Sequence, residues 1–188
     1  MERKKLAAPA MGRRRFIWAG GALVLASALG PTIARAAGKS DAKSLSLYSL
    51  YFHERIKVDY FANGTYVTGA LTEINKIMRD VWTNEITKMD VKLFDLVYDI
   101  QNLLDTKETI HIISGYRSPH TNGILAARST GVAKNSYHLR GMAVDIRVPN
   151  RSIKQLADAA QSLKRGGVGL YGGSKFVHVD TGPVRKWG

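Results

Sequence analysis

The chain has 188 residues, 28 lysines and arginines against 15 acidic residues, and a formal net charge of +13. It contains no cysteine, which excludes a disulfide framework and metal sites built on thiolates. The first 36 residues hold seven of the basic residues and one acidic residue, so the remainder carries +7. That remainder lacks the basic helix and the zinc-finger spacing of a dedicated nucleic-acid binder, and its charge suits an anionic partner such as a cell wall or a membrane surface.

The N-terminal segment has the pattern of an export signal. Arg13 and Arg14 precede an apolar run at 17–29, and small residues stand at positions −3 and −1 of a cleavage site after residue 36. The paired arginines predict a signal over residues 1–36 that is read by the twin-arginine export machinery, with a Sec signal or an uncleaved amphipathic anchor as alternatives. The apolar run is too short to span a bilayer comfortably, so we expect no stable membrane span after cleavage.

The rest of the chain alternates between strand and helix patterns. A flexible polar lead-in at 37–44 is expected to precede a single domain at 45–188. Apolar residues at helical spacing predict amphipathic helices that contribute to the core, and alternating runs predict strands. In chain order we expect a β-hairpin at 45–60, helices at 68–82 and 90–104, a strand at 109–114, a short helix at 121–129, a strand at 141–148, a helix at 152–163 and a final hairpin at 168–180. This order favours the α+β class, with helices packed on a small antiparallel sheet.

Two of the predicted strands carry potential metal ligands. Asp145 and His178 each lie on the strand face opposite to the apolar residues that would enter the core. His138 precedes the strand of Asp145 by a short turn, so the three side chains converge if the two strands are neighbours. Two imidazoles and one carboxylate with an open fourth position suit catalytic zinc, which lowers the pKa of a bound water to about 7 and polarises a carbonyl. Iron in a facial triad uses the same ligand types and is the alternative.

The residues around these ligands form a longer motif. Ser136-x-His138-x-x-Gly141-x-Ala143-x-Asp145 matches the SxHxxGxAxD pattern of the zinc peptidases that include D-alanyl-D-alanine carboxypeptidases and murein endopeptidases. The run FVHVDTG at 176–182 resembles the family strand with the last metal histidine, and shorter matches lie at 113–118, 131–134, 166–169 and 181–183. The chain resembles the murein endopeptidases most closely. The resemblance implies the fold shared by hedgehog and D-Ala-D-Ala peptidases, and one zinc ion bound by His138, Asp145 and His178.

The resemblance also indicates residues for the substrate. Arg117 matches the arginine that the family uses around the substrate, and its guanidinium can grip a carboxylate with two hydrogen bonds. Alternatively, Arg117 pairs with a nearby acid and locks its turn. Ser136 is expected to cap the turn into His138, with substrate contact as the alternative.

One family feature is missing from the sequence. Relatives place a general base two or three residues before the last metal histidine, whereas Lys175 and Phe176 stand at those positions here. Asp180 lies about 7 Å along the strand from His178, and we expect it to orient a ligand histidine or, alternatively, to assist the water as a base. His120 is the other candidate base.

Together these expectations describe a periplasmic zinc endopeptidase whose partners are the peptide stems of peptidoglycan. By resemblance, the bond cut is the cross-link between two diaminopimelate residues, with the D-alanine–diaminopimelate link as a second target. A carboxypeptidase that trims terminal D-alanine is one alternative. A wall-binding module that keeps a zinc site without turnover is another.

Overall fold

The computed structural model of the protein describes residues 41–129 and 131–188. These residues fall within one unit, Lys39–Gly188. The signal predicted at 1–36 and the first half of the lead-in lie outside the described residues. The strand β1 (Lys43–Ser49) begins two residues before the predicted domain boundary. Within the described ranges, no helix combines the length and the apolar character needed to cross a membrane.

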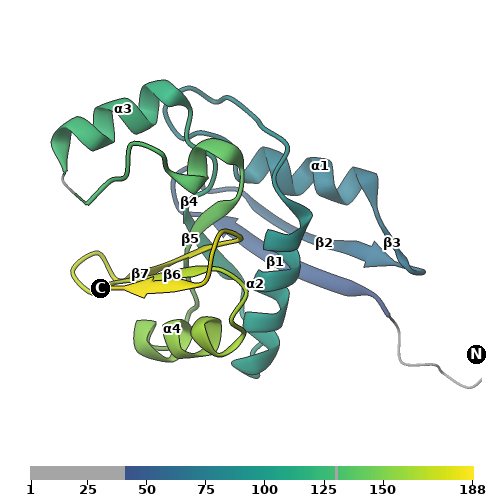
Figure 1. Ribbon diagram of the computed structural model, residues 1–188. Coiled ribbons are helices and arrows are strands. Elements are labelled where there is room, and N and C mark those ends of the chain that lie inside the picture. Colours follow the sequence, from purple (N-terminus) through teal and green to yellow (C-terminus); the bar gives the residue numbers. More distant parts are fainter. Residues whose placement is uncertain (1–40, 130) are drawn as a thin grey trace, which may run out of the picture. The chain divides into compact units, whose positions relative to one another are not determined.

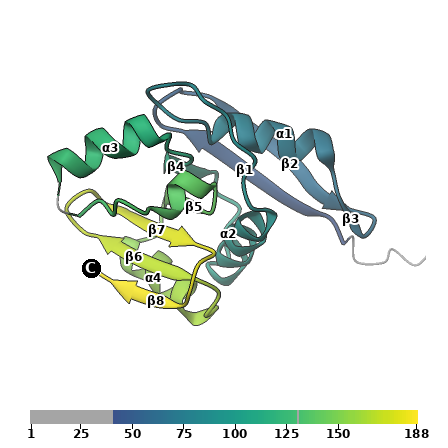
Figure 2. The ribbon, with the colours of Figure 1, turned by 45° about the horizontal axis from the view of Figure 1, so that its top comes forward.

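The described residues of the domain form one eight-stranded sheet in the order β3-β2-β1-β4-β5-β7-β6-β8. The other strands are β2 (Arg55–Ala62), β3 (Thr65–Tyr66), β4 (Ile110–Ser114), β5 (Ala143–Arg147), β6 (Gly167–Tyr171), β7 (Phe176–Asp180) and β8 (Arg185–Trp187). The sheet is mixed rather than wholly antiparallel, because β1 pairs with β4 and β6 pairs with β8 in parallel. Both parallel pairs follow from the connections. Strands β2 and β3 and helices α1 and α2 lie between β1 and β4 in the chain, and β7, which is antiparallel to β6, lies between β6 and β8. Figure 2 shows β7, β6 and β8 side by side.

In the described part of the chain, four α-helices and one short 3₁₀ helix complete the α+β fold, which confirms the predicted class. They are α1 (Thr68–Ile77), α2 (Val91–Leu103), α3 (Pro119–Arg128), η1 (Tyr137–Arg140) and α4 (Ile153–Ser162). Side-chain caps fix the starts of three of the α-helices, since Asp90, Ser118 and Ser152 each accept a hydrogen bond from a backbone N–H of the first turn.

The helix predicted at 68–82 is shorter than its apolar pattern. α1 ends at Ile77, and its N-cap is Val67 rather than Thr68. The chain turns after the helix because the buried carboxylate of Asp80 accepts hydrogen bonds from the backbone N–H groups of the two residues at 82 and 83. Apolar side chains beyond Ile77 therefore continue the helical spacing without continuing the helix.

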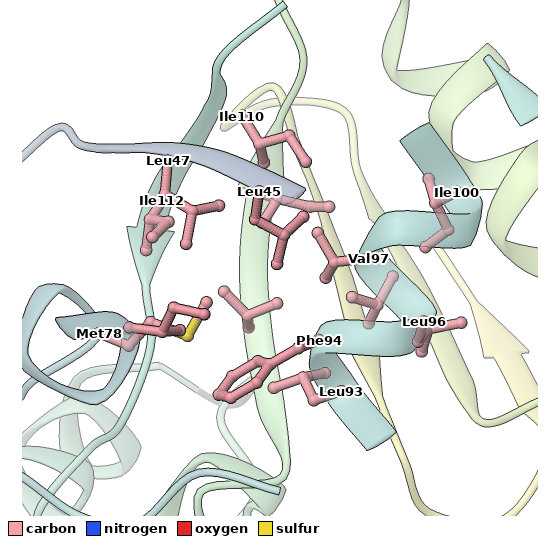
Figure 3. Close-up of a cluster of buried hydrophobic side chains, with 14 of the residues drawn as sticks. Leu45, Leu47, Met78, Leu93, Phe94, Leu96, Val97, Ile100, Ile110 and Ile112 are labelled. Carbon is pink, nitrogen blue, oxygen red and sulfur yellow. The ribbon is translucent and has the colours of Figure 1, made fainter. Parts of the chain in front are cut away.

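The hydrophobic core lies between the sheet and the helices α1, α2 and α4. Leu45 and Leu47 of β1 and Ile112 of β4 meet Leu93 and Phe94 of α2 there (Figure 3). In Figure 1, α3 and α4 lie on opposite sides of strands β6 and β7. Alternation along β5 and β7 sends Val144 and Val177 into the core, and their neighbours in sequence onto the other face. That other face carries the candidate site.

Candidate metal centre

His138, Asp145 and His178 come together on the sheet face away from the core. The strands β5 and β7 are antiparallel neighbours, and Asp145 lies directly opposite His178 in their register. The helix η1 brings His138 to the same place: Ser136 Oγ accepts a hydrogen bond from the His138 backbone N–H at 3.3 Å, and Gly141 ends the helix with a φ of 65°. A side chain at Gly141 would also crowd the backbone of the segment before α2, so this turn requires glycine.

The three side chains point single atoms at one another. His138 Nε2 lies 3.1 Å from His178 Nδ1, and Asp145 Oδ1 lies 3.2 Å from the first atom and 2.9 Å from the second. Tetrahedral zinc with ligands at about 2.0–2.1 Å separates its ligand atoms by about 3.3 Å. All three residues are buried, at most 7% exposed. The triangle therefore has the size and composition to hold one zinc ion after a shift of a few tenths of an ångström.

The second nitrogen of each imidazole has its own partner. His138 Nδ1 lies 2.6 Å from the carbonyl oxygen of Gly115, and His178 Nε2 lies 3.0 Å from Asp180 Oδ2. In a neutral ring, the partner accepts the single ring proton, which leaves the inward nitrogen with a lone pair for a metal. The Asp180 carboxylate is fully buried and also accepts from the backbone N–H groups of Gly167 and Gly182. Its position is that of a residue that orients His178.

Burial and charge act in opposite directions on the pKa values of the cluster. Burial raises the pKa of Asp145, but its neighbours, His138 foremost and then His178 and Arg117, hold that pKa well below its usual range. Burial is the main reason why the pKa of His138 lies below its ordinary value. Burial also lowers the pKa of His178, yet the carboxylates of Asp145 and Asp180 prevail and raise it. The ionised Asp145 and the deprotonated His138 are the states that metal binding requires.

Arg117 pairs with a nearby acid, which is one of the two alternatives that the sequence leaves open for it. Its Nη2 donates to Asp145 Oδ2 at 2.5 Å and its Nε donates to Ser114 Oγ at 2.9 Å. Those bonds fix the guanidinium against the candidate ligand, and the side chain still lines the cavity over the cluster. Ser136 caps η1 and lines the same cavity. The remaining donors of Arg117 are therefore available to a molecule bound in the cavity.

A cavity of about 700 Å³ opens over the cluster. Its lining includes the segment between α3 and η1 and three aromatic residues, Tyr171, Phe176 and Trp187. No sequence motif marks Tyr171 or Trp187 as a site residue. The structure does not bring His120 to the cavity, since this residue is exposed in the first turn of α3. Among the described residues, the lining holds no carboxylate or imidazole besides the three candidate ligands.

An α+β domain that gathers two histidines and an aspartate beneath an open cavity has the architecture of a metal-dependent hydrolase with a single ion. Comparisons with known proteins identify a family within this broad class. The chain belongs to the family described as "Peptidoglycan L,D-endopeptidase MepK", whose sequence profile matches residues 37–187. This result confirms the resemblance to murein endopeptidases.

Relatives in this family match almost the full length of the chain. The peptidoglycan L,D-endopeptidase MepK of Escherichia coli (strain K12) is 42% identical over 175 residues, which are 93% of this chain and 96% of the relative. The probable peptidoglycan L,D-endopeptidase MepK of Haemophilus influenzae is 36% identical over 176 residues, 93% of this chain and 95% of the relative. Both are therefore similar to this chain over the whole domain that carries the candidate metal centre.

Proposed function

We propose that the protein is a periplasmic, zinc-dependent endopeptidase that hydrolyses peptide cross-links of peptidoglycan, with the bond between two diaminopimelate residues as its main target. The observation that carries this proposal is the triangle of His138 Nε2, Asp145 Oδ1 and His178 Nδ1, with sides of 2.9–3.2 Å, beneath an open cavity. The names of the relatives supply the substrate and the L,D specificity. The D-alanine–diaminopimelate link is a second target.

His138, Asp145 and His178 would hold the zinc ion, and neighbouring groups would orient these ligands and bind the substrate. When bound, zinc supplies a Lewis acid for the scissile carbonyl and lowers the pKa of water. The Gly115 carbonyl and the Asp180 carboxylate fix the tautomers of the two rings. The guanidinium of Arg117, held through Nη2 and Nε, offers its other N–H groups to an oxygen of the substrate, where charge-assisted hydrogen bonds are strongest.

A digest of cross-linked muropeptides tests the proposal. The zinc-loaded protein should convert dimers into monomers, and mass analysis of the products identifies the bond that was cut. His138→Ala should abolish the conversion. His53→Asn is the matched control, because His53 is an exposed histidine and its φ of 55° is tolerated by asparagine. Release of D-alanine from unchanged dimers would select the carboxypeptidase instead.

One observation favours a second candidate, a wall-binding module that keeps the zinc site without turnover. Among the described residues, the cavity lining offers no further carboxylate or imidazole as a general base. Lys175 and Phe176 stand at the positions where the resemblance to the wider zinc peptidase family implies a base. Such a module would bind muropeptides in a pull-down and release no new amine, even in the presence of zinc. Cleavage by the wild-type protein rejects it.

The export route is part of the same proposal. Arg13 and Arg14, with the apolar run at 17–29, support delivery to the periplasm by the twin-arginine machinery. Fusion of residues 1–36 to a reporter should export it, and replacing both arginines with lysine should stop the export. Continued export of the double-lysine variant would favour the Sec route.

A further inference from the structure

Arg185, the first residue of β8, lines the same cavity as the three candidate ligands. Its Cζ atom lies 5.0 Å from the ring centroid of Tyr137 and 5.0 Å from that of Trp187, so aromatic rings hold the guanidinium through cation–π contacts. A Cβ atom at Gly167 would overlap the guanidinium and the Asp180 carboxylate. The surrounding residues therefore fix the position of this arginine, and its side chain is still 38% exposed.

The hydrogen bonds of Arg185 leave one side of its guanidinium unused. Nη1 donates to Asp180 Oδ1 at 3.1 Å and to the Pro183 carbonyl at 3.0 Å, and Nη2 donates to Asp180 Oδ2 at 2.6 Å. Asp180 thus takes the fork formed by the two terminal nitrogens. Of the five N–H donors, Nε–H and the second hydrogen of Nη2 have no partner among the described residues. These two donors form the other fork, which fits a second carboxylate.

The charges of the site favour an anion at this fork. Arg117 and Arg185 balance Asp145 and Asp180, so a divalent cation would leave the centre with an excess positive charge. In a diaminopimelate–diaminopimelate cross-link, the carbon that carries the scissile nitrogen also carries a free carboxylate. That carboxylate belongs to the stem that leaves as the amine. It lies one carbon from the bond that the metal centre would cut.

We infer that Arg185 is a specificity-determining residue whose free Nε–Nη2 fork binds this carboxylate on the leaving-group side of the scissile bond. The inference rests on the proposed function and deepens it. Arg185 holds both carboxylates at once, Asp180 on the buried side and the substrate on the cavity side. The recognition requires the planar fork and not only its charge, because lysine cannot present two parallel donors.

Two synthetic cross-linked peptide dimers test the inference, one with the free carboxylate beside the scissile nitrogen and one with that group as its amide. The zinc-loaded wild-type protein should cleave the acid with a kcat/KM about 10- to 100-fold above that of the amide, the loss expected for a charge-assisted pair. Arg185→Gln should bring the ratio close to one, and Arg185→Lys should retain only part of the preference. Lys186→Gln, an exposed cation on the same strand, should keep the wild-type ratio.

The ratio separates specificity from a structural role, because damage to Asp180 or to the fold lowers the rates for both dimers together. Equal cleavage of acid and amide by the wild-type protein, or an undiminished ratio in Arg185→Gln, would overturn the inference while the proposed function stands. If the wild-type protein cleaves neither dimer, the proposed function fails. Calorimetry on the metal-free protein with the monomeric stem peptide and its amide then decides the inference alone: the acid should bind at least about tenfold more tightly, and equal affinities would refute it.

Discussion

Replacing Asp80 with asparagine tests whether one buried carboxylate joins the turn after α1 to the start of α3. Asp80 is fully buried and accepts four hydrogen bonds. The donors to Oδ1 are the backbone N–H groups of Trp82 and Thr83, both at 2.8 Å, and the hydroxyl of Thr121 at 2.9 Å; the donor to Oδ2 is the backbone N–H of Ser118 at 2.7 Å. The residue before Ser118 is Arg117, so this junction also positions the cavity lining.

The expected loss of stability in Asp80→Asn follows from the number of donors that the side chain can still accept. Asparagine can keep its oxygen toward the three donors at Oδ1, but its NH₂ group then faces the N–H of Ser118. One charge-assisted hydrogen bond is lost and its donor stays buried, which costs about 1.5–3 kcal/mol, and the other three bonds lose the strengthening effect of the ion. We therefore expect Asp80→Asn to lower the free energy of unfolding by about 2–4 kcal/mol at pH 7.

Urea denaturation at pH 7 and in acid measures this loss of stability and tests whether the charge of Asp80 causes it. Burial raises the pKa of Asp80, but the hydrogen bonds outweigh burial and hold that pKa below its ordinary value. The carboxylate thus stabilises the fold fully above its unfolded pKa of about 3.9 and loses this effect as the pH falls through the lower folded pKa. The difference in the free energy of unfolding between the wild-type protein and Asp80→Asn should therefore become smaller as the pH falls. Asp158→Asn, on the exposed side of α4, should change stability by less than about 0.5 kcal/mol. A gap for Asp80→Asn below about 1 kcal/mol at pH 7, or one that stays constant in acid, would refute the reasoning.

Three further changes test the centre and the core. Asp180→Asn should weaken zinc binding by about 10- to 100-fold, because the partner of His178 Nε2 loses its charge; competition with a chelator measures this, and an affinity within twofold of wild type would contradict it. Phe94→Ala should lower the free energy of unfolding by about 3–5 kcal/mol, because the side chain is completely buried; a urea midpoint equal to that of wild type would be inconsistent with its place in the core. Gly182→Ala should reduce kcat/KM without loss of zinc, since its Cβ would overlap the Tyr137 ring at the cavity wall; unchanged kinetics would show that the wall position is not needed.

The convergence of the three candidate ligands could be predicted from the sequence, because strand alternation and the pairing of neighbouring strands follow local rules. Alternation placed Asp145 and His178 on the outward faces of their strands, and the pairing of β5 with β7 sets them opposite each other. The short turn before β5 does return His138 to the cluster, although as the 3₁₀ helix η1. The expectation that Asp180 orients a ligand histidine agrees with its contact to His178.

The cavity wall could not be predicted in the same way. Strand β8 has only three residues and pairs with β6 through a non-local parallel contact, so no periodicity marks it. That pairing brings Trp187 and Arg185 to the site. The apolar pattern also does not predict the early end of α1. The turn there depends on Asp80, whose carboxylate accepts hydrogen bonds from Ser118 and Thr121, far along the chain.

A zinc titration followed by cleavage tests the central claim most directly. The metal-free protein is given increasing zinc, and conversion of a diaminopimelate-linked dimer is measured at each step. Activity should rise linearly and stop rising at one zinc per chain, with no activity in Asp145→Asn at the same zinc concentrations. Cleavage by the fully chelated protein, or full activity in Asp145→Asn, would contradict the assignment of catalysis to a zinc ion held by His138, Asp145 and His178.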